Sequence, residues 1–553
     1  MKNIIKLKSF LWAIIILLAF SSCEDVLNRP PANQLSSEGF YNTPAQCEQS
    51  VIGIYAGLRN ISDLEFLNLS EVRSDNTWVE TRPNGQRDYS DIGTFKAGDN
   101  LATISSAWNR WYSIIYNANV AITKIADCDF GSRESFKNQL LGEAYFIRGW
   151  AYFEMTRLFG NIPLIDKPAS PSEIERTGQS TPREIYDKIV VRDLLEAKAK
   201  LPLSRDMVNA NGSNISSGGR ADRIAAQAML GRIYMTMAGF PVNDASAKSL
   251  AETELKAVLD FSSANNEKYW APDSVEWRKQ WMPNTGYYNK YSIFAIQYRE
   301  GGTGNPSIFN FSPSLPPTYT SIRIFGNGIW VEMTLAYEFE RIYSGTNSYD
   351  ARGNNYSVLT GYDAEPNWPS YTQEKRTITL PNGSEADVFT RTMIYKFLPT
   401  KRKLEALGMP NNYENSIRDY NDWGVNFPII RLEDVMLMYA EILIEKGDIA
   451  GAMNIVNKIR TRAGCDPEET TVSAADALYF VKRERRVELL GEGVRWFDLI
   501  RWNEWKSSIE KLFDRYNDPS TDKANIRDGR YLYPVPMTEM NVKPGLYQQN
   551  EGY

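Results

Sequence analysis

Residues 134–159 read ESFKNQLLGEAYFIRGWAYFEMTRLF and carry the clearest helical pattern in the chain. Apolar side chains recur there at steps of three and four, among them Leu140, Ile147 and Leu158. This period places them on one face of a helix. Gly160 follows, and glycine readily adopts the left-handed backbone that ends helices. The stretch therefore predicts one long helix.

Similar periods extend on both sides of this stretch. The ranges concerned are 101–126, 181–200, 221–237, 247–262, 431–446, 449–463, 474–490 and 495–505. Short connections between successive ranges favour antiparallel helix pairs, and Ala440, Gly447 and Ala452 supply the small residues that tetratricopeptide-type pairs need for close packing. No fixed period holds throughout. The pattern predicts an all-α, tetratricopeptide-like helical-repeat scaffold.

Residues 265–430 have a different character. Tyr, Trp, Asn, Gly and Pro become dense, and long helical periods vanish. Turn signals recur, and Asn382-Gly383 is a dipeptide typical of hairpins. We expect an irregular, aromatic-rich insert with a few short strands. Loops of this length in a compact protein are usually functional.

The composition excludes several classes of function. The net charge of −6 is unfavourable for binding nucleic acid, which needs a positive surface. The chain has no histidine, which excludes Ser-His-Asp and Cys-His catalysis and histidine-ligated zinc. The segment 127–131 begins like a calcium loop, but Asn138 stands where such a loop needs Glu. We expect no enzyme activity, no cofactor and no metal.

The N-terminus resembles a lipoprotein signal. Basic residues precede an apolar run at 10–20, and Ser21 and Ser22 then lead into Cys23. This order defines a secretory signal over residues 1–22, and the run is too short to span a bilayer. We expect lipidation of Cys23, a tether over 23–37 and one domain over 38–553; plain secretion is the alternative.

The other cysteines are Cys47, Cys128 and Cys465. Three thiols cannot all pair with one another, and no Cys-x-x-Cys spacing exists. We expect them to be small buried apolar residues.

Five blocks of sequence resemble the SusD/RagB family of nutrient-binding lipoproteins. They are GEAYFIRGWAYFEMTRLFGNIPLI (142–165), GRADRIAAQAMLGRIY (219–234), IRLEDVMLMYAE (430–441), RERRVELLGEGVRWFDLIRW (483–502), and YLYPVP (531–536) with QNEGY (549–553). They occur in the family's order and cover essentially the whole chain. The resemblance implies four tetratricopeptide-like units, a lipid anchor in the outer membrane and a SusC-like TonB-dependent transporter as partner. Glu24 and Asp25 resemble the signal that sends such lipoproteins to the cell exterior.

The cargo implied by the resemblance is most often an oligosaccharide. The sequence thus predicts a non-catalytic protein that captures a glycan and hands it to the transporter. Alternatives are the same role with peptide or other nutrient cargo, a protein-binding scaffold, and a glycosidase built on two carboxylates. The charged residues of the blocks are expected to be structural ion pairs; they are Arg148, Glu154, Arg157, Glu484, Arg486, Glu488, Arg495 and Asp498.

A sugar offers apolar faces for aromatic stacking and hydroxyl groups for polar side chains, so loop aromatics and short polar residues are the candidates. The first group lies in a polar loop and comprises Asp75, Asn76, Trp78 and Arg82; the alternative is that Asp75 and Asn76 cap a turn. The second group lies in the insert and comprises Tyr287, Tyr288, Tyr298, Arg299, Tyr319 and Trp330, with core packing as the alternative for the rings.

Overall fold

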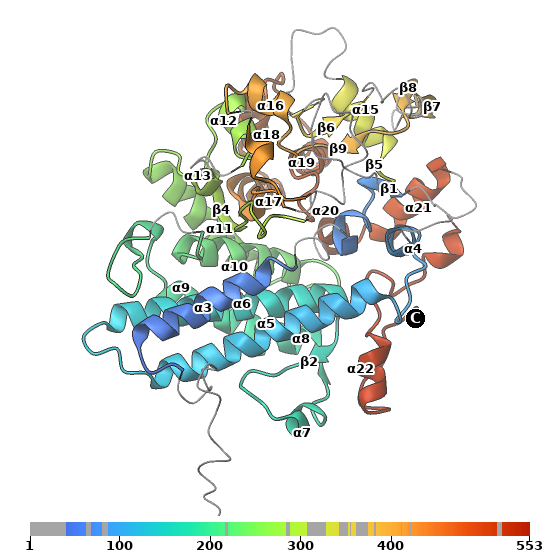
Figure 1. Ribbon diagram of the computed structural model, residues 1–553. Helices are drawn as coiled ribbons and strands as arrows, with labels where there is room; N and C mark the ends of the chain where they lie inside the picture. Colours follow the sequence, from blue (N-terminus) through green and yellow to red (C-terminus); the bar gives the residue numbers. More distant parts are fainter. Residues whose placement is uncertain are drawn as a thin grey trace, which may run out of the picture.

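The structure is a computed structural model. It describes residues 40–61, 68–79, 87–215, 219–283, 288–306, 328–341, 352–353, 356–360, 374–380, 383–410, 412–419, 422–516 and 522–553. Helices dominate these residues, and the few strands are short. The long helices α3, α5 and α6 lie side by side in the lower half of Figure 1, and most of the short elements lie in the upper half. The predicted all-α scaffold with a tetratricopeptide-like arrangement is confirmed.

The first helical layer matches the predicted ranges closely. Its members are α5 (Ala102–Asp127), α6 (Glu134–Phe159), α8 (Pro182–Ile185), η2 (Tyr186–Val190), α9 (Val191–Lys200), α10 (Arg223–Ala238) and α11 (Ala247–Ala264). A further helix, α3 (Pro44–Leu58), was not predicted. It begins with a capping box in which Thr43 and Gln46 bond reciprocally. Both α10 and α11 contact α17, which joins this layer to the C-terminal helices.

Two glycines set how closely these helices approach. A Cβ atom on Gly149 of α6 would lie 2.1 Å from Cδ2 of Leu194 on α9. A Cβ atom on Gly231 of α10 would lie 2.5 Å from Cδ2 of Leu255 on α11. Both distances are far below van der Waals contact, so any larger side chain would push the helices apart.

The C-terminal helices are α17 (Leu432–Glu445), α18 (Ile449–Arg462), α19 (Ala474–Glu488), α20 (Arg495–Arg501), α21 (Trp505–Tyr516) and α22 (Met537–Val542). Ala440 and Ala452 are fully buried where α17 packs on α18, and Gly447 turns the chain between them with φ +82°. The expected single helix over 495–505 is wrong. Asn503 takes a left-handed φ of 57°, so α20 ends and α21 begins after a sharp turn.

The described residues contain five two-stranded antiparallel pairs. They are β1 (Thr77–Val79) with β5 (Ile329–Val331), β2 (Ile162–Pro163) with β3 (Gln179–Ser180), β4 (Ser292–Ile296) with β10 (Phe427–Arg431), β6 (Val358–Leu359) with β9 (Met393–Ile394), and β7 (Lys375–Thr379) with β8 (Glu385–Phe389). The last pair is the hairpin that Asn382-Gly383 predicted; Gly383 has φ +83°, and Asn382 lies outside the described residues.

Short helices fill the remaining described segments. They are α4 (Arg87–Gly93), α7 (Pro171–Ile174), α12 (Ser274–Lys279), α13 (Tyr288–Tyr291), α15 (Met333–Arg341) and α16 (Lys401–Ala406), with single turns η3 (Ser204–Asp206), η5 (Tyr413–Ser416) and η6 (Lys523–Asn525). The expected irregular insert therefore contains short helices as well as short strands.

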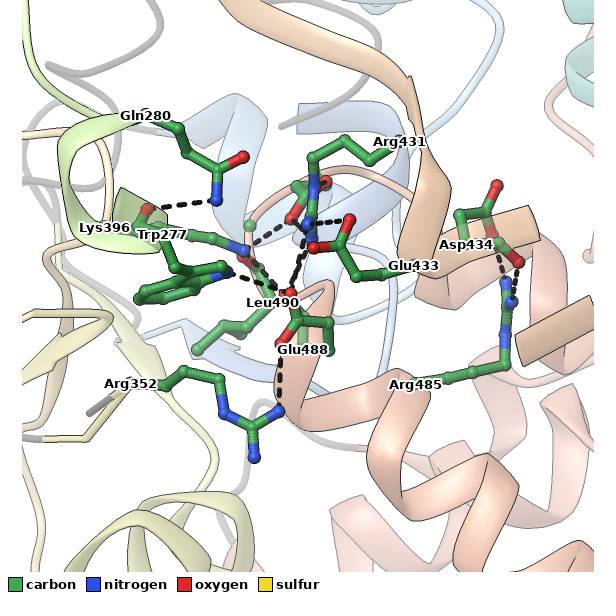
Figure 2. A network of polar contacts seen from close by, with 12 residues as sticks. Trp277, Gln280, Arg352, Lys396, Arg431, Glu433, Asp434, Arg485, Glu488 and Leu490 are labelled. Atoms are coloured by element: carbon green, nitrogen blue, oxygen red, sulfur yellow. Dashed lines mark hydrogen bonds and ion pairs between the residues drawn. The ribbon is translucent and has the colours of Figure 1, made fainter. Parts of the chain in front are cut away.

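A buried charge network connects α17, α18 and α19 to the insert. Glu488, which is fully buried, lies among Arg352, Arg431 and Trp277 in Figure 2. Its carboxylate accepts hydrogen bonds from Arg352 (2.9 Å), Arg431 (3.0 Å) and Arg462 (2.8 Å). Burial by itself would raise the pKa of Glu488, but the guanidinium groups around it hold that pKa well below its usual range.

Other charged residues of the five sequence blocks also form buried ion pairs. Arg148 pairs with Asp193 at 2.6 Å, and Asp498 pairs with Arg485 at 2.9 Å. All four side chains are almost fully buried. The interpretation of these charges as structural ion pairs is confirmed, and such pairs specify how helices pack more than they add to stability.

The three described cysteines are buried and not disulfide-bonded. Burial raises the pKa of the Cys47 thiol to about 12. The interpretation of these cysteines as small buried residues is confirmed. Within the described ranges, no group of acidic residues and cysteines has the arrangement of a metal site. In the same part of the chain, no helix has the length and apolar character needed to cross a membrane.

Candidate ligand-binding site

Strands β1 and β5 bring together one residue from each predicted group of candidates. Trp78 is the direct cross-strand partner of Trp330. Directly opposed residues of an antiparallel pair project from the same face of the sheet. Trp330 is nevertheless only 2% exposed, whereas Trp78 is partly exposed. The strand pair therefore buries one indole ring and leaves part of the other accessible.

Trp78 stacks on Tyr516 at the end of α21. The two ring centroids lie 3.9 Å apart, and the ring planes differ by 9°. The backbone N–H of Met333, at the start of α15, donates to the Tyr516 hydroxyl oxygen at 3.1 Å. Tyr516 thereby covers one face of the Trp78 ring and fixes its orientation. Tyr516 was not among the predicted site residues, because the sequence pattern did not separate α21 from α20.

Asp75 anchors the loop that leads into β1. Arg495 donates to both oxygens of the Asp75 carboxylate, at 2.7 and 2.9 Å. Each of the two side chains is 13% exposed. Burial by itself would raise the pKa of Asp75, but the guanidinium groups of Arg495 and Arg486 outweigh it and hold that pKa well below its usual range. Asp75 is thus a charged anchor with both oxygens engaged.

Asn76 is also held by protein partners. Its amide nitrogen donates to Glu71 at 2.7 Å, and its amide oxygen accepts from Arg486 at 3.0 Å. Glu71 is fully buried and accepts from the backbone N–H groups of Gly491 (3.0 Å) and Gly493 (3.2 Å). The side chain of Asn76 is therefore occupied in joining the loop to the turn after α19.

Glu332 completes the base of this region, two residues beyond Trp330. It is fully buried and accepts from the backbone N–H of Thr334 at 3.0 Å, at the start of α15. Arg486 of α19 approaches it at 3.3 Å, and Arg515 of α21 forms a second ion pair with it. Helices α15, α19 and α21 thus meet at Glu332, which directly follows β5. We call Trp78 and Tyr516, together with Glu332, the Trp78 platform.

The remaining candidates lie elsewhere or outside the described residues. Tyr298 follows β4, is 3% exposed, and its hydroxyl donates to the carbonyl of Arg59 at 2.9 Å. Arg299 is exposed in the next position. Tyr288 is the first residue of α13, but its side chain is not among those described. The candidates outside the described residues are Cys23, Arg82, Tyr287 and Tyr319.

The described chemistry of the platform suits binding more than catalysis. The nearby acids Asp75, Glu71 and Glu332 are all engaged by arginines, an amide or backbone N–H groups. A glycosidase needs one carboxyl group that can donate a proton and a second one across a cleft. The partly exposed indole ring of Trp78 sits on a rigid support, and an aromatic ring is a suitable surface for stacking.

Comparison with known proteins places the chain in a family. A family model described as "SusD family" matches residues 260–553, and one described as "Starch-binding associating with outer membrane" matches residues 27–235. A SusD-like protein of Formosa agariphila is 26% identical over 516 residues, covering 89% of this chain and 90% of the relative.

Solved structures share the fold. A SusD homologue from Bacteroides thetaiotaomicron has a TM-score of 0.72 at 20% identity, over 94% of this chain and 98% of the homologue. A structure titled "Laminarin binding SusD-like protein" has a TM-score of 0.67 at 20% identity, over 93% of this chain and all of the other. The five sequence blocks, the helical scaffold and these matches agree, and the chain belongs to the SusD/RagB family.

Proposed function

We propose that this protein is a non-catalytic, lipid-anchored protein of the outer membrane that captures an oligosaccharide and delivers it to a SusC-like TonB-dependent transporter. Family membership supports the role, and one family model carries starch binding and outer-membrane association in its description. A structural neighbour is described as binding laminarin. The cargo class proposed for this chain is accordingly a glycan.

The observation that carries the proposal is the Trp78 platform. A sugar ring binds an aromatic face through its C–H groups, and a ring that is already fixed loses little conformational entropy on binding. Trp78 is fixed on one side by Tyr516 at 3.9 Å and along its backbone by β5. Arg82, Tyr287, Tyr288, Tyr319 and Arg299 are proposed as further contacts, and Tyr298 and Trp330 as supporting residues behind them.

Calorimetry with a Trp78→Ala variant tests the platform. Loss of one stacking face should weaken binding of an oligosaccharide about tenfold, which corresponds to about 1.4 kcal/mol. Tyr479→Ala is the matched control, because Tyr479 is 54% exposed on α19 and its loss leaves the platform intact. Equal affinity in both variants would move the site away from Trp78. A panel of glycans that gives no heat, with peptides that bind, would change the proposed cargo to peptide.

Two further experiments test the anchor and the partner. A Cys23→Ala variant is expressed in a host with lipoprotein processing. It should be absent from the membrane fraction, and its mass should lack the lipid that the wild-type chain carries. A tagged wild-type chain purified from detergent-solubilised outer membranes should carry a TonB-dependent transporter with it. A Cys23→Ala chain that stays in the membrane, or a tagged chain that purifies alone after mild cross-linking, would contradict the respective part of the proposal.

A further inference from the structure

A second aromatic pocket lies far from the Trp78 platform. It is formed by α5, the segment after β2, α7 and the C-terminal α22, and has a volume of about 180 Å³. Figure 1 shows α7 and α22 at the lower end of the molecule, away from β1 and β5. One water needs only about 10–15 Å³ of such a space, so the pocket has room for a ligand well above the size of a single water.

The walls of this pocket are aromatic and fixed. Trp108 and Tyr112 form the floor, with ring centroids 5.2 Å apart and planes inclined by 48°. The Tyr112 hydroxyl donates to the carbonyl of Pro163 at 2.8 Å, and Trp108 packs edge-on against Phe159 at 5.0 Å. These contacts hold the rings in place before any ligand arrives, so little entropy is lost when a ligand binds.

The rim offers a ring face and polar groups. Tyr116, 52% exposed, lies at the mouth, one helical turn after Tyr112 on α5. Asn109 presents an exposed amide from the same helix. Tyr547, 9% exposed, closes the opposite side. The exposed ring of Tyr116 beside the aromatic floor offers a face on which a sugar ring can stack.

Glu539 of α22 supplies the acceptor. Its side chain is half-buried among the rings and takes a hydrogen bond from the Trp108 indole. Burial raises the pKa of its carboxyl group. It also takes a hydrogen bond from Thr538, and among the described residues it has no ion-pair partner. A carboxylate in this position is a strong acceptor for hydroxyl groups.

We infer that this pocket binds one neutral pyranose ring of a glycan, with Tyr116 stacking on the sugar face and Glu539 and Asn109 bonding its hydroxyl groups. The inference rests on the proposed function and adds to it a second point of attachment, at the far end of the helical layer. Two separated contacts on one chain would raise the overall affinity for a long glycan above that for a short one, because the second contact forms intramolecularly.

Ligand-observed NMR by saturation transfer tests the pocket directly. The probes are glucose, galactose, mannose and xylose at millimolar concentration, with choline as an organic-cation probe. We expect at least one sugar to receive saturation on its ring protons, with binding weakened about fivefold in Tyr116→Ala and in Glu539→Gln. Tyr479→Ala should retain that signal. The pocket variants and this control are all compared in a Trp78→Ala background, so that sugar bound at the Trp78 platform does not contribute to the signal. Both Tyr116 and Tyr479 are exposed, so neither change should disturb folding.

Other outcomes overturn the inference. If no sugar gives a signal, the pocket has no pyranose site. The same conclusion follows if the signal persists unchanged in Tyr116→Ala and Glu539→Gln. A choline signal that depends on Glu539, without any sugar signal, would make the pocket an organic-cation site instead. Neither result bears on the oligosaccharide calorimetry of Trp78→Ala, so failure of this inference is distinguishable from failure of the proposed function.

Discussion

Replacing Asp75 by asparagine should destabilise the protein by about 2–4 kcal/mol, because removing one partner of a buried ion pair leaves the other charge uncompensated. Asp75 and Arg495 are each 13% exposed and share two hydrogen bonds of 2.7 and 2.9 Å. Asparagine can accept only one of these bonds, and it removes the negative charge. The affinity of the folded protein for a glycan should change much less, since Asp75 has no free oxygen to offer.

Urea unfolding followed by tryptophan fluorescence measures the effect, with Asp187→Asn as the matched control. Asp187 also pairs with an arginine at 2.7 Å, Arg183, but the two side chains are 50% and 55% exposed. An exposed pair contributes about 1 kcal/mol or less. The reasoning is refuted if Asp75→Asn is no more destabilising than Asp187→Asn while glycan affinity falls tenfold, because Asp75 would then contact the ligand.

Three further predictions follow from burial and packing. Trp330→Ala should cost about 3–5 kcal/mol in urea unfolding, because the ring is 2% exposed; a stable variant with lost glycan affinity would place that ring against the ligand. Gly149→Ala should lower stability by about 1–3 kcal/mol, whereas Gly178→Ala, with nothing within 4 Å, should be close to neutral; equal effects would contradict the close helix approach. Burial alone would raise the pKa values of Asp434 and Asp498, but their buried arginine partners hold both pKa values below the usual value. Their contribution is therefore present above the unfolded pKa of about 3.9 and is lost as pH falls from there towards the lower folded pKa values, so Tm should drop mainly below about pH 4; a flat profile from about pH 4 down to about pH 2 would contradict the pairing.

The helical layer was predictable because its signals are local. Apolar spacing and the following Gly160 located α6 to the residue, as Glu134–Phe159. The break between α20 and α21 was not predictable in the same way, since it depends on Asn503 adopting a left-handed backbone that its sequence neighbours do not require. Helix α3 was missed although Thr43 and Gln46 form a capping box that could have been read from the sequence.

The site was only partly predictable, because its contacts join distant parts of the chain. Asp75 and Arg495 are 420 positions apart, and nothing near Asp75 distinguishes an anchor from a ligand contact. The pairing of Trp78 with Trp330, and the stacking of Trp78 on Tyr516, depend on the tertiary fold in the same way. Sequence reasoning singled out Trp78 as a ring in a polar loop, whereas the structure places it on β1. The sequence could not tell which neighbouring residues support that ring.

The central claim is that the protein captures a glycan without altering it. The most direct measurement is a calorimetric titration of the mature protein against a panel of plant, host and microbial oligosaccharides and a matched panel of peptides, followed by chromatography of each mixture for products. The account predicts saturable binding of at least one oligosaccharide, with the sugar recovered intact. Binding of peptides alone, or shortened products from any glycan, would contradict it.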